Sequence, residues 1–145
     1  MLNVRVIPCL LLRNGGLVKS VKFKSHRYVG DPINAVRIFN DKEVDELVFL
    51  DIGARAVNIG PNFELLADIA SEAFMPFGYG GGIRDFDDVK RLYALGVEKV
   101  ILNTVAYEVP GLVSRAAELA GSSGVVVSVD VKRSLFGNYS VVTRC

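Results

Sequence analysis

Short apolar runs alternate with amphipathic helical patterns along the whole chain, and no other feature limits its fold so strongly. The apolar runs typical of β-strands are residues 4–12, 46–51, 75–79, 97–103 and 124–132. The helical patterns between them are residues 31–42, 62–73, 85–96 and 109–121, and the polar stretch before the first of these is expected to be a long loop. Strands that alternate with helices predict a parallel sheet covered by helices. A further run, 139–144, is expected to pair with 124–132 as a hairpin.

Two α/β architectures fit this order, an open doubly wound sheet and a (β/α)8 barrel. No G-x-G-x-x-G motif follows the first strand, which weakens the dinucleotide-binding alternative. Period-2 alternation places Arg5 and Cys9 on one face of the first strand, and Ser128 and Asp130 on one face of the fifth. Polar residues on these faces lie mostly toward the strand ends, as in a barrel whose interior is packed and whose chemistry lies at the carboxyl ends of its strands. We therefore predict an α/β protein of the (β/α)8 barrel class.

The length of the chain limits how much of such a barrel it can contain. A complete barrel needs roughly 250 residues, whereas the chain has 145. A sheet that stopped at the fifth strand would leave strand edges unpaired and one apolar face uncovered. We therefore expect residues 1–145 to be the N-terminal part of a single barrel domain, with roughly its first five strands and four helices.

Composition and charge argue against several classes of function. Half of the residues are apolar, which predicts a globular core, and the net charge of +1 gives no sign of a nucleic-acid-binding surface. Cys9 and Cys145 do not make a disulfide framework, and no cluster of histidine and cysteine indicates a metal site. The first apolar run is too short to cross a membrane. We expect a cytoplasmic protein with reduced thiols, no metal and no cofactor.

Three consecutive glycines, Gly80, Gly81 and Gly82, follow the third strand and precede the helix at 85–96. A glycine-rich turn before a helix lets a phosphate approach the unpaired amide groups of the first helical turn. Asn103 and Thr104, after the fourth strand, would add side-chain donors to the same anion. The alternative is a tight strand-to-helix turn that needs glycine only for its geometry. Three glycines in a row, with Asn-Thr one unit later, favour a phosphate site.

Five blocks keep their places in this strand–helix order: MLNVRVIPCL, VDELVFLDI, PFGYGGGIRDFDDV, LGVEKVILNTVAYEVPGLV and VVVSVDVKR. Together they resemble HisF, the cyclase subunit of imidazole glycerol phosphate synthase, over the length of the chain. The resemblance implies a lyase that takes ammonia from a HisH-type glutaminase and closes an imidazole ring in histidine biosynthesis. Its substrate has a phosphate at each end, and Gly80–Gly82 with Asn103-Thr104 match one phosphate site.

The same resemblance implies two catalytic aspartates, one after strand one and one after strand five, that act as general acid and base. Asp130 matches the second, although a carboxylate that caps its own loop is the alternative. Leu11 stands where the family has the first aspartate, and a leucine cannot transfer a proton. Lys19 matches a family lysine on the flexible first loop that folds over the substrate; by itself it would pass for an exposed lysine.

Three charged residues fall at the N-terminal ends of strands one, two and four: Arg5, Glu46 and Lys99. Burial of such charges is costly unless they pair. In HisF these positions match a ring that gates the entry of ammonia beneath the glutaminase. The alternative is a salt-bridge plug that only stabilises this end of the barrel.

The run IPCLLLRNGGLVKSVKFKSHRYVGDPINAVRIFN resembles most a subset of HisF-like proteins from surface-polysaccharide gene clusters. These work with a HisH-like glutaminase and an amidotransferase that converts a sugar acetamido group into an acetamidino group, as in lipopolysaccharide biosynthesis. Two hypotheses stay open. The first is an ammonia-using subunit that acts on a phosphorylated small molecule, in histidine biosynthesis or in sugar amidation. The second is a non-catalytic barrel that docks a glutaminase and passes ammonia to a separate enzyme.

Overall fold

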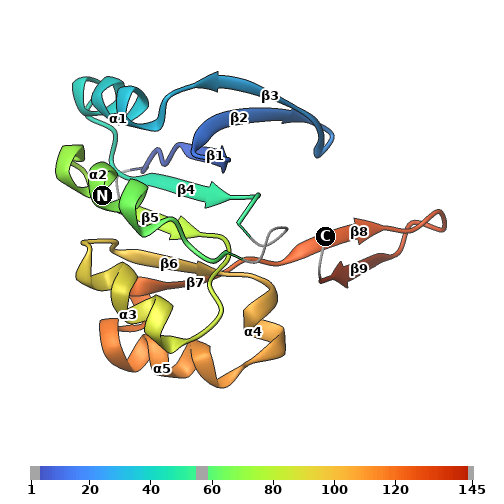
Figure 1. The fold of residues 1–145 in the computed structure, drawn as a ribbon. Coiled ribbons are helices and arrows are strands. Elements are labelled where there is room, and N and C mark those ends of the chain that lie inside the picture. The colour runs from blue at the N-terminus through green and yellow to red at the C-terminus, as the bar shows by residue number, and fades with distance from the viewer. Residues whose placement is uncertain (1–3, 55–58, 144–145) are drawn as a thin grey trace.

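A computed structural model describes residues 4–54 and 59–143 of the chain. Its main sheet has seven strands in the order β3-β2-β1-β4-β5-β6-β7 (Figure 1). Five of these run parallel as neighbours: β1 (Cys9–Arg13), β4 (Leu47–Asp51), β5 (Phe77–Gly80), β6 (Lys99–Leu102) and β7 (Val125–Val127). Each predicted parallel strand is therefore present, in the predicted order.

Four helices connect these strands: α1 (Pro32–Asp41), α2 (Phe63–Glu72), α3 (Phe86–Ala94) and α5 (Gly111–Ala120). Side chains at the N-caps explain where three of them begin, because Asp31, Asn62 and Asp85 each accept hydrogen bonds from amides of the first turn. The helices pack on one face of the sheet, where alternate strand residues such as Phe49, Tyr79 and Leu102 are buried. This is the predicted architecture of a partial (β/α) barrel.

The first predicted strand and the loop after it differ from the structure. β1 begins at Cys9 rather than at residue 4, although Pro8 still accepts a hydrogen bond from the Val48 amide. The predicted long loop is a hairpin of β2 (Gly16–Val21) and β3 (Lys24–Gly30). Asn14-Gly15, with φ of 52° and 76°, forms the tight turn from β1 into β2, and Lys22-Phe23, with φ of 51° and 61°, forms the turn between β2 and β3; both have the left-handed conformation that a two-residue hairpin requires.

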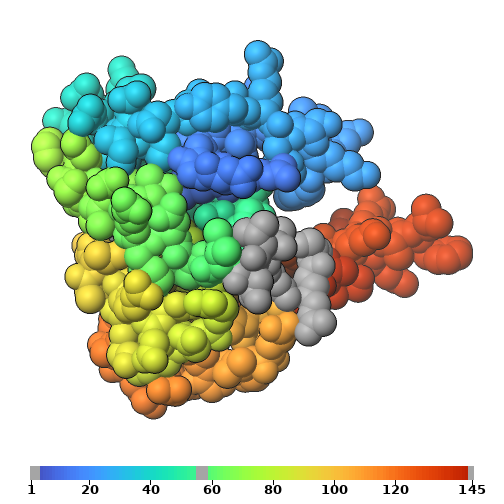
Figure 2. Space-filling model, viewed as in Figure 1, coloured from blue at the N-terminus to red at the C-terminus, as the bar shows by residue number. Residues whose placement is uncertain are grey.

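The last predicted strand, 124–132, is divided in two. β7 ends at Val127, and β8 (Asp130–Arg133) leaves the main sheet to pair with β9 (Tyr139–Val142). The predicted hairpin is therefore confirmed. Only the β8 part of the predicted strand 124–132 pairs in it, whereas the β7 part stays in the main sheet. Figure 2 shows this hairpin projecting from the body of the molecule. A short helix, α4 (Thr104–Glu108), and a 3-10 turn, η1 (Ser122–Gly124), were not predicted.

Candidate functional site

The three charged residues predicted at the N-terminal strand ends come together in the structure. Glu46 directly precedes β4, and its side chain is 2% exposed. Lys99, the first residue of β6, places its Nζ 2.7 Å from Oε1 and 2.5 Å from Oε2 of Glu46. Arg5 donates from Nη2 to Oε2 of Glu46 at 3.1 Å. One buried carboxylate thus binds two cations at this end of the sheet. One of them, Arg5, lies in the segment that precedes β1.

Each glycine of the predicted phosphate loop has a close protein neighbour. A Cβ at Gly80 would lie 2.8 Å from the Cβ of Ile101. At Gly81, where φ is 122°, it would overlap the backbone carbonyl of Asp51. At Gly82, where φ is 67°, it would lie 2.8 Å from the Cβ of Ala54. Contacts within the protein therefore require all three glycines, whether or not an anion binds here.

Two amides at the start of the helix after this loop are capped by a side chain of the protein. The side chain of Asp85 accepts from the amides of Asp87 and Asp88 at the start of α3. Asp88 in turn accepts from the backbone amide and from Nε of Arg84. A carboxylate thus already lies at the positive end of α3 and accepts from the amides of Asp87 and Asp88.

Asn103 follows the end of β6 and Asp130 follows the end of β7, so both lie at the carboxyl ends of neighbouring parallel strands of the main sheet. Asn103 donates from Nδ2 to Oδ2 of Asp130 at 2.9 Å, which joins the residue after β6 to the first residue of β8. Asn103 is also the N-cap residue of α4, yet its side chain makes no cap hydrogen bond. Its Oδ1 is buried without a hydrogen-bond partner in the structure. An asparagine at a helix N-cap usually accepts a hydrogen bond from an amide of that helix. The Asn103 side chain instead donates to Asp130 and leaves the first turn of α4 without a side-chain cap.

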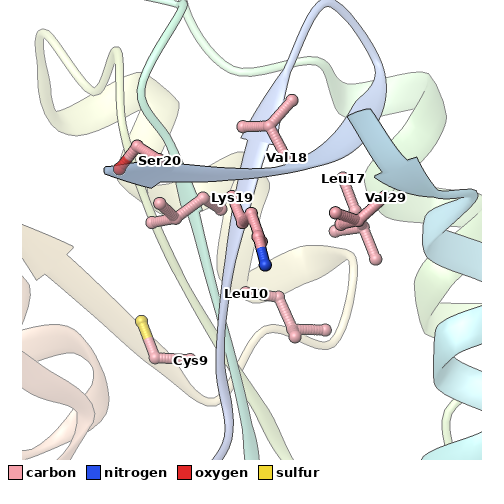
Figure 3. Close-up of a pocket in the computed structure, with 8 residues that line it drawn as sticks. Cys9, Leu10, Leu17, Val18, Lys19, Ser20 and Val29 are labelled. Carbon is pink, nitrogen blue, oxygen red and sulfur yellow. The ribbon is translucent and has the colours of Figure 1, made fainter. Parts of the chain in front are cut away.

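Lys19 and Leu11 belong to a different part of this edge. The resemblance placed Lys19 on a flexible loop, whereas in the structure it lies on strand β2. Both residues line a pocket of about 340 Å³ between β1 and the hairpin, together with Cys9 (Figure 3). Burial raises the pKa of the Cys9 thiol, so this sulfur favours its neutral form.

Sequence analysis missed a second group of polar residues, behind the glycine loop. Tyr79 is 1% exposed, and its hydroxyl has no hydrogen-bond partner. Burial, followed by the nearby carboxylates of Asp51 and Asp88, raises the pKa of Tyr79 far above its usual range. Asp51 uses Oδ1 to accept from the amides of Gly53 and Ala54, so it caps its own loop. A tyrosine within a buried strand was the only available signal of this group.

Residues 4–54 and 59–143 contain no group of three or more His, Cys, Asp or Glu side chains placed to hold a metal ion. None of the helices in these ranges combines the length and apolar character needed to cross a bilayer. The polar clusters at the two ends of the strands are thus the chemically distinctive features of the sheet.

The fold and the two polar clusters define the class of protein as a partial (β/α) barrel. Residues 5–144 match the family of histidine biosynthesis proteins, and the chain belongs to that family. A putative imidazole glycerol phosphate synthase subunit hisF2 of Pseudomonas aeruginosa is 54% identical over 144 residues, which is 99% of this chain and 57% of that protein. An imidazole glycerol phosphate synthase subunit HisF of Gluconacetobacter diazotrophicus is 41% identical over 99% of this chain and 56% of its own length.

A putative subunit hisF3 of Vibrio vulnificus is 51% identical over 138 residues, 95% of this chain and 53% of that protein. The chain therefore spans somewhat more than half the length of these relatives. The resemblance to HisF inferred from the sequence blocks is confirmed.

Proposed function

We propose that this chain is part of a HisF-like subunit that delivers ammonia along the inner face of its sheet to a phosphorylated small molecule. The observation that supports this most is the Arg5–Glu46–Lys99 cluster at one end of that face, with Asn103 and Asp130 at the other. The relatives named as imidazole glycerol phosphate synthase subunits support the same chemistry. Ammonia would come from a HisH-type glutaminase docked beneath the cluster.

The Arg5–Glu46–Lys99 cluster suits an ammonia gate better than a salt-bridge plug that only stabilises the fold. A buried carboxylate shared between two cations is weak support for stability, because apolar side chains of similar size would do as well or better. A lysine, by contrast, can exchange a carboxylate partner for another acceptor and thereby open a path. Lys99 is suited to this, since its side chain is 26% exposed while that of Glu46 is 2% exposed.

At the opposite end, we assign Asp130 as the group that exchanges a proton with the substrate. The Asn103 amide holds its carboxylate at 2.9 Å, which fixes one oxygen and leaves the other for proton transfer. The backbone of Gly80–Gly82 and residue Thr104 would bind a substrate phosphate. Gly81→Val should then weaken the binding of a phosphorylated ligand in calorimetry, and unchanged affinity would exclude this loop.

The partner can be tested with the full-length protein and the HisH-type glutaminase of the same genome. Sedimentation at micromolar concentrations should show a complex. Lys99→Met should uncouple glutamine hydrolysis from ammonia use, while Lys90→Met, on the outer helix α3, should leave coupling intact. Absence of a complex, or equal coupling in the two variants, would refute the gate.

Leu11 favours a second candidate, amidation of an acetamido sugar for a surface polysaccharide with a separate amidotransferase. Leu11 lines an apolar pocket on β1, at the position where the family resemblance implies a catalytic aspartate. One positioned acid or base contributes roughly 10²–10⁴-fold in rate, so cyclisation of the ribulosyl nucleotide with ammonium salt should be slower by about that factor. Leu11→Asp should restore part of it if the rest of the site is intact. Full cyclase activity with Leu11 in place would exclude this branch, and a barrel that only docks the glutaminase would show neither reaction.

A further inference from the structure

The turn between β8 and β9 is closed by its own hydrogen bonds. The two strands form a separate two-stranded sheet, so the hairpin pairs within itself. The Ser134 amide donates to the carbonyl of Asn138 at 2.7 Å, and the Asn138 amide donates to Oγ of Ser134 at 3.2 Å. Gly137, with φ of 85°, donates to the carbonyl of Ser134 at 3.1 Å. The tip therefore has a defined shape before any partner binds.

Two large apolar side chains lie at this tip, where turns usually carry small or polar residues. Leu135 is 103% exposed and Phe136 is 93% exposed, so neither contributes to the core. Figure 2 shows the hairpin extending away from the body of the molecule. A single apolar residue on a surface needs no explanation, but an adjacent pair at a projecting tip favours a contact surface.

One face of the hairpin extends this apolar surface and adds charge at its margin. The cross-strand pairs Val131–Val141 and Arg133–Tyr139 lie on that face. The Arg133 guanidinium is 5.9 Å from the centre of the Tyr139 ring. Residues 131–145 contain three Lys or Arg and no Asp or Glu. An apolar centre with a cationic margin fits a protein partner that has an apolar pocket and an acidic rim.

The hairpin lies at the end of the strands opposite the Arg5–Glu46–Lys99 cluster. β8 begins at Asp130, just after β7 ends at Val127. The strand from Asp130 to Arg133 carries the tip roughly 10 Å farther, at about 3.3 Å per residue. A protein bound at the tip would therefore leave the cluster and its glutaminase unobstructed, and it would lie at the end where ammonia leaves the sheet.

We propose that the tip of the β8–β9 hairpin docks the separate amidotransferase of the second candidate function, in an apolar pocket with an acidic rim on that enzyme. This docking rests on that candidate function and adds to it the surface on which the ammonia-accepting enzyme binds. The glutaminase and the accepting enzyme then occupy opposite ends of the same strands. The competing occupant of the tip is the rest of the full-length protein.

Binding is measured by calorimetry between the full-length protein and the purified sugar amidotransferase of the same genome. Phe136→Ser removes the aromatic anchor and should weaken the affinity at least about tenfold, as for other interface hot spots. The matched control is Phe74→Ser, because Phe74 is 89% exposed but precedes β5 at the amino ends of the strands. It should leave the affinity unchanged. No binding by the natural protein at micromolar concentrations, or equal losses in the two variants, would overturn the proposal.

A stability measurement distinguishes a partner from the rest of the protein as the occupant. Because Phe136 is 93% exposed, Phe136→Ser should leave the urea midpoint of the full-length protein unchanged. A lower midpoint would show that the rest of the protein covers the tip and would overturn the proposal. Lys132→Met should slow association a fewfold at low salt and have little effect at high salt, because exposed charges act mainly on the association rate.

Two rates of amidation separate a failure of this docking from a failure of the ammonia gate. With glutamine and the glutaminase present, Phe136→Ser should lower the rate at which the sugar is amidated. With ammonium salt in place of glutamine, the same variant should match the natural protein. Lys99→Met should also lower the glutamine-dependent rate but should leave the affinity for the amidotransferase intact. A Phe136→Ser protein with the natural glutamine-dependent rate would overturn the docking, whatever Lys99→Met does.

Discussion

Replacing Lys99 with methionine tests what the ion cluster contributes to the fold. The Glu46 carboxylate is almost fully buried and receives both of its shortest contacts from Lys99 Nζ, at 2.5 and 2.7 Å. Removing one partner of a buried pair costs about 3–5 kcal/mol. Here Arg5 still reaches Glu46 at 3.1 Å, and Lys99 is itself one-quarter exposed. We therefore expect Lys99→Met to lower the free energy of unfolding by about 2–3 kcal/mol.

The control is a lysine whose ion pair lies in water. Lys90 on α3 contacts Asp87 at 2.6 Å, with 52% and 81% of the two side chains exposed. Water screens such a pair, so Lys90→Met should lower the urea midpoint much less than Lys99→Met does. Both variants are followed by circular dichroism in urea. Equal losses in the two variants would refute the assignment of a desolvated carboxylate at Glu46.

The double variant Glu46→Met with Lys99→Met separates stability from function. Replacing a buried ion pair by apolar side chains is often neutral or stabilising by about 1–4 kcal/mol. Stability should therefore recover toward that of the natural protein. Such a recovery would mean that the fold does not need the charges, which supports a role in ammonia passage. A double variant as unstable as Lys99→Met alone would identify the cluster as a structural plug.

Three further changes test contacts inside the fold. Tyr79→Phe removes a buried hydroxyl that has no partner and should raise the free energy of unfolding by about 1 kcal/mol in urea; a loss would mean that the hydroxyl is bonded. Gly81→Ala should destabilise by about 1–3 kcal/mol or more, and by more than Gly15→Ala, because only the first introduces a Cβ against a backbone carbonyl. Because burial raises the Cys9 pKa, less thiolate is present at any given pH. In a Cys145→Ser background, the rise of the alkylation rate with pH should therefore occur at higher pH for Cys9 than for a free cysteine peptide. Coincident pH–rate profiles would contradict this.

The sequence predicted the parallel sheet well because buried strands and capped helices leave local signals. Asp31 and Asn62, for example, mark helix starts by side chains that accept from the first turn. The antiparallel strands at residues 16–30 were missed, although Asn14-Gly15, the turn from β1 into β2, is a strong hairpin signal. Their charged and polar residues suggested a loop, and β3 is indeed almost wholly exposed. Polar composition outweighed turn chemistry in that interpretation.

Contacts between distant residues were harder to predict. The predicted strands placed Arg5, Glu46 and Lys99 at one end of the sheet, and the structure joins Glu46 to Lys99 across 53 residues of sequence and to Arg5 across 41. No local pattern indicated that the Asn103 amide would reach Asp130, because that contact depends on β8 leaving the main sheet directly after β7. The site is thus predictable where strand ends define it and unpredictable where loops and side-chain rotamers do.

The phosphate and proton-transfer hypotheses compete for one side chain. Asn103 has a single amide group, and in this structure that group donates to Asp130 and leaves a buried oxygen acceptor without a partner. A phosphate needs donors, and the Asp85 carboxylate already accepts from the first amides of α3. If the amide stays with Asp130, a phosphate must therefore bind through backbone groups of the glycine loop and through Thr104. If a phosphate draws the amide away, the Asp130 carboxylate loses its hydrogen bond when the substrate arrives. The second case would couple phosphate binding to the readiness of Asp130 for proton transfer.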